Sequence, residues 1–127
     1  MFTHVMVGSN DPEKSRAFYT ETPGALGYAP HAHGDHTFFT DGNGGFGVGR
    51  PANGEPAHHA NGGTIGFKAK TIAEVDAFYA AGLANGGTCE GKPGVRENAP
   101  GKSYGAYLRD PDGNKICAYA PNPDAAG

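Results

Sequence analysis

The sequence lacks the features that indicate a nucleic-acid or membrane partner. Its formal net charge is -3, and its 127 residues contain no run of Lys or Arg, so we expect neither phosphate backbones nor anionic lipid surfaces to bind. No apolar run is long enough to span a bilayer, and the first ten residues lack the basic region of a secretory signal peptide. We therefore expect a cytoplasmic protein.

Cysteine is scarce, whereas glycine and proline are abundant. The only two cysteines, Cys89 and Cys117, do not form the framework of a disulfide-stapled domain, and we expect both thiols to stay reduced. The 22 Gly and 10 Pro approach the composition of disordered low-complexity chains. They cluster between periodic apolar segments, as turn residues do, so we predict a folded, turn-rich domain.

The first half of the chain predicts the element order βαβββ. Alternation marks a strand over 2–7, in which His4 and Met6 share one face. Asp11-Pro12 indicates a helix start, with the helix running to about Thr22. Three short strands are then predicted over 26–31, 36–40 and 45–49.

The same order restarts after a linker over 51–61. A strand over 64–67 is followed by Thr71-Ile-Ala-Glu74, a capping box in which the Thr hydroxyl and the Glu carboxylate satisfy reciprocal backbone donors. A buried stripe from Ile72 to Leu83 predicts the helix that follows. Three further strands are predicted over 88–90, 104–109 and 115–119.

Self-similarity between the two halves supports a duplicated unit. Ala17-Phe18-Tyr19 recurs as Ala77-Phe78-Tyr79, and other positions match at the same offset. The closing turns match at a slightly larger offset, so we place an insertion over 91–101 and interpret it as a mobile lid. We predict one α+β domain over 1–127. Its parts are module one (about 1–50), the linker, module two (about 62–120) and a frayed tail (121–127).

These features resemble a known superfamily. Two βαβββ units, an Ala-Phe-Tyr helix in each and the stretch Asp110-Pro-Asp-Gly-Asn-Lys-Ile116 are similar to the vicinal oxygen chelate superfamily, which includes glyoxalase I, extradiol dioxygenases and bleomycin-resistance proteins. The resemblance implies curved mixed sheets that enclose a central cavity and, in many members, a homodimer. It also implies a cavity with four metal ligands in metal-using members, usually two His or Gln and two Glu.

Carried over by register, the four ligand positions are His4, Phe46, Thr64 and Cys117. Only His4 matches the pattern, because a Phe ring offers no donor and Thr is a poor ligand. We therefore expect no metal cofactor; if a divalent metal binds, His4 and Cys117 are its candidate ligands. His4 could act as a general acid or base or be a satisfied buried histidine, and Cys117 could be an activated or an inert thiol.

A second motif competes with this interpretation. The string His31-Ala-His33-Gly-Asp35-His36 matches the H-x-H-x-D-H ligands of metallo-β-lactamase-fold hydrolases. That fold needs a chain nearly twice as long and further downstream ligands, but no histidine follows residue 59. We expect a polar turn that leads into the next strand, and the sequence assigns His31, His33 and His36 no role beyond adventitious surface metal binding.

The predicted function is binding of a small organic molecule in the central cavity. Met6 and Phe46 are its expected apolar contributors, and His4, Thr64 and Cys117 its polar ones. The Tyr104 hydroxyl is a further candidate, although strand parity leaves its face undecided. By the resemblance, loss of the ligands favours sequestration of the kind that bleomycin-resistance proteins perform. The alternative is a metal-dependent lyase, isomerase or dioxygenase that uses His4 with non-standard ligands.

Overall fold

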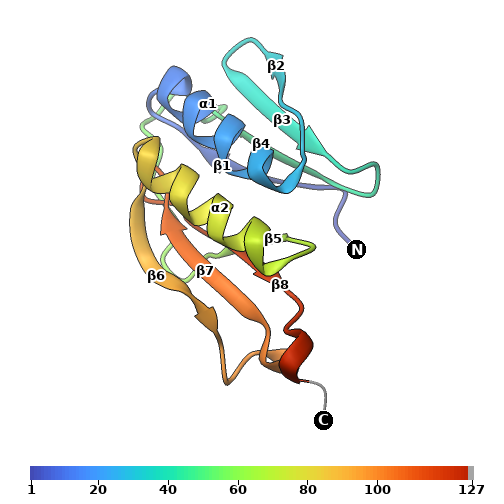
Figure 1. The fold of residues 1–127 in the computed structure, drawn as a ribbon. Helices are drawn as coiled ribbons and strands as arrows, with labels where there is room; N and C mark the ends of the chain where they lie inside the picture. The colour runs from blue at the N-terminus through green and yellow to red at the C-terminus, as the bar shows by residue number, and fades with distance from the viewer. Residues whose placement is uncertain (126–127) are drawn as a thin grey trace.

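Two four-stranded sheets form the framework of the structure, a computed structural model that describes residues 1–125 (Figure 1). The first sheet has the order β1-β4-β3-β2 and the second β5-β8-β7-β6. In each, the first strand pairs parallel to the last and the other pairs are antiparallel. The predicted α+β fold is confirmed. The strands are β1 (His4–Gly8), β2 (His31–His33), β3 (His36–Thr40), β4 (Gly45–Gly49), β5 (Ile65–Lys68), β6 (Thr88–Val95), β7 (Tyr104–Arg109) and β8 (Lys115–Ala120).

Two helices lie side by side over the sheets, α1 (Pro12–Glu21) and α2 (Ile72–Ala84) (Figure 1). The Asp11 side chain caps α1 by accepting from the backbone N–H of Lys14. Thr71 Oγ1 caps α2 by accepting from Glu74 N at 3.1 Å, but the Glu74 carboxylate accepts from Lys70 N rather than from Thr71. The capping box is thus extended by one residue. Neither helix is long and apolar enough to cross a membrane.

Two predicted segments differ from the structure. The strand predicted over 26–31 is wrong, because Pro23–Leu26 forms a 3-10 turn (η1), which Gly27 ends at a φ of +92°, and β2 begins only at His31. The lid predicted over 91–101 is wrong in its first half, since β6 continues to Val95 and pairs with β7 through two register shifts. Short 3-10 turns also occur at Pro100–Lys102 (η2) and Pro123–Ala125 (η3).

One hydrophobic core lies between the helices and the sheets and belongs to both modules. Phe46 of β4 has ring-centroid distances of 5.0 Å both to Tyr19 on α1 and to Phe67 on β5. Phe67 in turn approaches Phe78 on α2. The aromatic contacts therefore run without a break from one module to the other, so the two modules share their burial of apolar surface.

The turn between β7 and β8 fastens the second module to α1. Asp110 Oδ2 accepts from the Tyr19 hydroxyl at 2.6 Å and from Asn114 Nδ2 at 2.8 Å. Asn114 Nδ2 also donates to the carbonyl of Gly8, and Asp112 accepts from the backbone N–H of Asn10. Burial raises the pKa of the Asp110 carboxyl, while these hydrogen bonds favour its ionised form.

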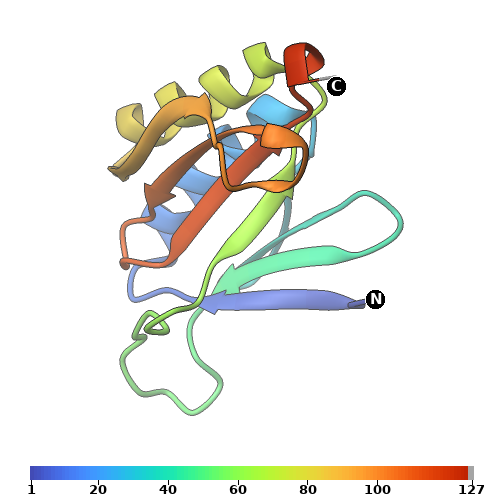
Figure 2. The same cartoon turned by 90° about the horizontal axis from the view of Figure 1, so that it is seen from below.

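The faces of the sheets that the helices do not cover are called here the open faces. Figure 2 shows the two sheets inclined to each other, with the helices beside the second sheet and β1 extending away from it. On β1, His4 and Met6 share one face, as predicted; this is the open face, while Val5 and Val7 pack toward the core. The open faces carry the chemistry considered next.

Candidate functional site

Three of the predicted site residues, His4, Phe46 and Thr64, line one hollow of about 450 Å³. It lies where the first residues of β1 and β4 approach β5. Its walls are mostly apolar and come from both modules, and Asp41 and Lys68 lie among its polar lining residues. The hollow therefore combines an apolar interior with a few charged or hydrogen-bonding groups, which is the usual character of a small-molecule site.

His4 is exposed and weakly anchored. Its Nδ1 lies 2.9 Å from the Thr3 hydroxyl oxygen, and in the described part of the chain this is the only hydrogen bond to its ring. A buried histidine satisfied by a neighbour, one of the two interpretations of this residue, does not fit this exposure. Apart from this bond to Thr3, the ring is exposed at the edge of the hollow.

Phe46 is on the wrong face to be a ligand position, which corrects the sequence alignment. Val5 pairs with Phe46, and its counterpart Ile65 pairs with Ile116, so the residue that corresponds to Cys117 is Gly47. Phe46 is only 5% exposed and closes the hollow from the core side. The open face at this position offers a glycine, which has no side-chain donor at all.

The other three candidates lie elsewhere. Met6, 43% exposed, lines a second hollow of about 490 Å³ beside the linker. Tyr104 lies on the helix-facing side, where its hydroxyl donates to Asp76 Oδ1 on α2 at 2.6 Å, and this bond raises the pKa of Tyr104. Cys117 is 4% exposed and lines neither hollow. The structure thus joins His4, Phe46 and Thr64 but not these three.

Cys117 has the character of an inert thiol. Burial raises its pKa to about 11, more than the nearby positive charge of Lys115 lowers it. An activated thiol needs a lowered pKa and access to solvent, and Cys117 has neither. Of the two interpretations of this residue, the activated thiol is therefore not supported.

The donor set does not fit a metal ion. Within residues 1–125, no three His, Cys, Asp or Glu side chains come together in a way that could hold one. At the four superfamily positions the side chains are an imidazole, a hydroxyl and a buried thiol, with a glycine at the fourth. Carboxylate and imidazole donors, on which open divalent sites depend, are thus reduced to one.

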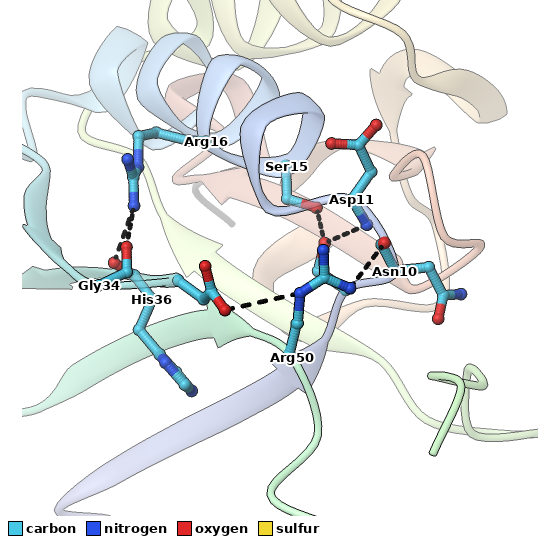
Figure 3. Close-up of polar contacts among 9 residues, drawn as sticks. Asn10, Asp11, Ser15, Arg16, Gly34, His36 and Arg50 are labelled. Atoms are coloured by element: carbon cyan, nitrogen blue, oxygen red, sulfur yellow. Dashed lines mark hydrogen bonds and ion pairs between the residues drawn. The ribbon is translucent and has the colours of Figure 1, made fainter. Parts of the chain in front are cut away.

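Two arginines hold the turn of the histidine string, one through its backbone carbonyls and the other through its acid (Figure 3). Arg16 donates to the carbonyls of Gly34 and His36 at 2.8 and 3.3 Å. Asp35 pairs with Arg50 at 3.5 Å, and the His36 ring stacks on Phe38. The predicted polar turn is present, and its carboxylate is engaged in a salt bridge.

The relationship to known proteins matches this architecture. A model of the Glyoxalase/Bleomycin resistance protein/Dioxygenase superfamily matches residues 1–118. The chain belongs to this superfamily. Its structure is similar to that of a glyoxalase/bleomycin resistance protein from Albidiferax ferrireducens T118, with a TM-score of 0.89 and 52% identity over 96% of this chain and 99% of that chain.

More distant superfamily structures share the fold alone. A glyoxalase-related enzyme from Fulvimarina pelagi has a TM-score of 0.75 at 19% identity, covering 97% of this chain and 88% of that chain. Fosfomycin resistance protein FosX from Mesorhizobium loti has a TM-score of 0.67 at 15% identity, covering 98% and 94%. No curated protein matched the chain.

Several lining residues of the hollow escaped the sequence analysis. Tyr28 follows the turn that replaced a predicted strand, and its hydroxyl donates to the Lys68 carbonyl at 3.4 Å. Lys68 could have been found, because it follows Thr64 and Gly66 at strand alternation and so shares their face. Asp41 was recognised only as a turn residue, and nothing local to it indicates a site.

Proposed function

We propose that this superfamily member binds a small organic molecule in the hollow at His4 and Thr64, without a metal at the superfamily ligand positions. The observation that carries the proposal is the hollow itself. Its volume of about 450 Å³ falls within the roughly 300–1,000 Å³ of small-molecule sites. Sequestration, not metal-dependent turnover, is the activity that its side chains support best.

The lining indicates the kind of ligand. Phe39, Phe46 and Phe67 contribute apolar aromatic surface from three strands, which suits a flat, largely apolar body. Among the polar groups, backbone hydrogen bonds from Asn43 and Gly44 keep the pKa of Asp41 below its usual value, so this carboxylate is ionised at neutral pH. Lys68 supplies the opposite charge. A ligand with an apolar body and polar substituents at one end would use both.

The test is a thermal-shift screen of small organic molecules, each with and without a chelator. A hit should raise the melting temperature equally in both conditions. Thr64→Phe should abolish the shift by filling the hollow, whereas Thr88→Phe should retain it. Thr88 is also an exposed threonine, at the start of β6 on the opposite edge of the same sheet, and therefore serves as the matched control.

Metal analysis tests the alternative, a metal-dependent enzyme. We expect the chelator-washed protein to take up no stoichiometric iron, manganese, nickel or zinc. One tightly held equivalent that disappears in His4→Ala, but not in His31→Ala, would overturn the proposal in favour of a metal-dependent lyase or dioxygenase. The homodimer and the cytoplasmic location implied at the outset stay predictions, and light scattering of the purified protein tests the first.

A further inference from the structure

The open face of the second sheet carries a group of four half-buried side chains that the hollow does not use. They are called here the basic tyrosine cluster and comprise Arg96, Tyr107, Lys115 and Tyr119. Tyr107 lies on β7, and Lys115 and Tyr119 on β8, at alternate positions to the residues that pack against α2. Their side chains therefore face away from the core.

Arg96 is held flat on this face by backbone carbonyls. Its guanidinium carbon lies 5.6 Å from the centre of the Tyr107 ring, and its Nη2 donates to the Lys92 carbonyl at 2.6 Å. Gly91, which pairs with Tyr107, makes room, because a Cβ there would lie 3.2 Å from Nη2. Arg96 is thus fixed in place by neutral acceptors, so its positive charge is positioned but not balanced.

Lys115 adds a second charge to the same ring. Its Nζ lies 5.1 Å from the centre of the Tyr107 ring. None of the three ion pairs within residues 1–125 includes Arg96 or Lys115. Glu90, the acid whose pKa Lys115 helps to lower, is paired with Arg109 at 3.0 Å. The charged residues here are Arg96, Arg109, Lys115 and Glu90. They give three positive charges and one negative, in a chain whose net charge is -3.

The two tyrosines of the cluster are bonded to each other through their hydroxyls. Their oxygens lie 2.6 Å apart, so one hydroxyl donates to the other, and a hydrogen bond from Tyr107 to the Cys117 side chain partly offsets the rise in the pKa of that thiol. Tyr119 lies flat over Gly105, where a Cβ would come within 2.6 Å of its ring. Burial and the bond to Tyr119 raise the pKa of Tyr107, so its hydroxyl stays protonated. The positive charges of Arg96 and Lys115 therefore lie near the ring of one protonated tyrosine.

We propose that the basic tyrosine cluster binds a small oxyanion, the carboxylate or phosphate group of an organic molecule, at a site separate from the hollow. A planar guanidinium matches either group with paired hydrogen bonds, and Lys115 adds a second positive charge near the same ring. The faces of Tyr107 and Tyr119 would then contact the rest of the molecule. This inference does not depend on what occupies the hollow.

Direct titration tests the proposal. The chain contains six tyrosines and no tryptophan, so a tyrosine ultraviolet difference spectrum or calorimetry can follow binding of inorganic phosphate. Calorimetry also follows benzoate, with neutral benzyl alcohol as the control. We expect saturable binding of an anion, weakened by added salt, and no saturable binding of benzyl alcohol at this site. Phosphate without benzoate would identify a free-phosphate site, and benzoate without phosphate a carboxylate site.

Variants locate the bound anion. Arg96→Gln and Lys115→Gln should each weaken binding about tenfold, equivalent to roughly 1.4 kcal/mol, with melting temperatures reported alongside to show that each variant folds. Lys92→Gln is the matched control, since this exposed lysine serves the cluster only through its backbone carbonyl. Arg96→Lys should retain part of the affinity.

Three results would overturn the proposal. The first is that neither anion binds saturably to the unaltered protein. The second is that Lys92→Gln weakens binding as much as Arg96→Gln, which would make the effect one of general charge. The third is that Thr64→Phe abolishes anion binding while Arg96→Gln preserves it, which would place the anion in the hollow. Conversely, loss in Arg96→Gln with binding preserved in Thr64→Phe separates this site from the proposed function.

Discussion

The open faces of the two sheets differ in chemistry although the sheets share one strand order. On the first sheet β4 alternates glycine with apolar residues, and side chains from both neighbouring strands lie over those glycines. Met6 and Phe38 cover Gly47, where a Cβ would lie 2.5 Å from the Met6 sulfur, and the His36 ring covers Gly49. The side chains that cover these glycines are thus apolar groups and an imidazole.

On the second sheet the glycines stand at other strands and receive other side chains. Gly91 and Gly94 of β6 lie beneath Arg96, and Gly105 of β7 lies beneath Tyr119. The helix-facing sides of both sheets stay apolar, since they build one core. The residues of the duplicated unit that pack in the core are therefore constrained to be apolar. Its open faces differ because glycines at different strands make room for different long side chains.

The largest expected effect is a loss of stability on changing the β7–β8 turn, which we compare with the same change in the β3–β4 turn. Asp110 accepts four hydrogen bonds within the core junction, two of them on Oδ2. In Asp110→Asn an amide would face these donors, and we expect a loss of about 3 kcal/mol in the free energy of unfolding. Urea denaturation measures it.

Asp41 is the matched position in the first module. It accepts from the backbone N–H groups of Asn43 and Gly44, but it is fully exposed to solvent. Asp41→Asn should therefore change the urea midpoint far less than Asp110→Asn does. Equal losses from the two variants would show that the β7–β8 turn is no more important to the fold than the β3–β4 turn.

A smaller difference is expected at Gly27 and Gly87, which match between the modules. A Cβ at Gly87 would lie 2.5 Å from Phe18 Cε2 and 2.9 Å from the carbonyl oxygens of Gly82 and Arg109. Gly87→Ala should cost about 2 kcal/mol, because backbone oxygens cannot turn aside. Gly27 faces open space at a φ of +92°, so Gly27→Ala should cost about 1 kcal/mol through backbone strain alone. Thermal unfolding of both variants measures the order, and the reverse order would contradict it.

The smallest effect is one of reaction rate at the two thiols. Cys117 has a pKa raised to about 11, so at pH 8 roughly one molecule in a thousand carries its thiolate, and burial blocks access. Cys89 is exposed. An aromatic disulfide reagent should label one thiol quickly and the second only on unfolding, and Cys89→Ser should remove the fast phase. Because the thiolate is the reactive form, the slow rate should rise as pH approaches the raised pKa. Fast labelling of Cys117 would restore the activated-thiol hypothesis.

Local patterns predicted most of the framework. β3, β4 and β7 have the predicted bounds, because each alternates side chains and is bounded by turn residues. The strand predicted over 26–31 failed because Pro23 continues the helical course of the chain beyond Thr22. β6 was predicted too short, since its register shifts interrupt the alternation.

The site was harder to predict than the fold. Aligning the two turns by their Asp-Gly-Asn sequence moved the register by one residue, and one residue reverses the face of a strand, so Phe46 took the place of Gly47. His4 and Thr64 were predicted to be equivalent positions from the sequence repeat alone, and both line the hollow. Tyr28 and Asp41 reach the hollow from segments far apart in sequence, and no periodic pattern connects such residues.

The contacts of the β7–β8 turn also have a consequence for the order of folding. They join residues 91 to 106 positions apart: Tyr19 with Asp110, Asn10 with Asp112 and Gly8 with Asn114. Such closures carry a large entropy loss and slow the formation of the structure. During synthesis the first module therefore emerges with the carbonyl of Gly8 and the hydroxyl of Tyr19 lacking their protein partners. We expect its final packing to wait until the last hairpin leaves the ribosome.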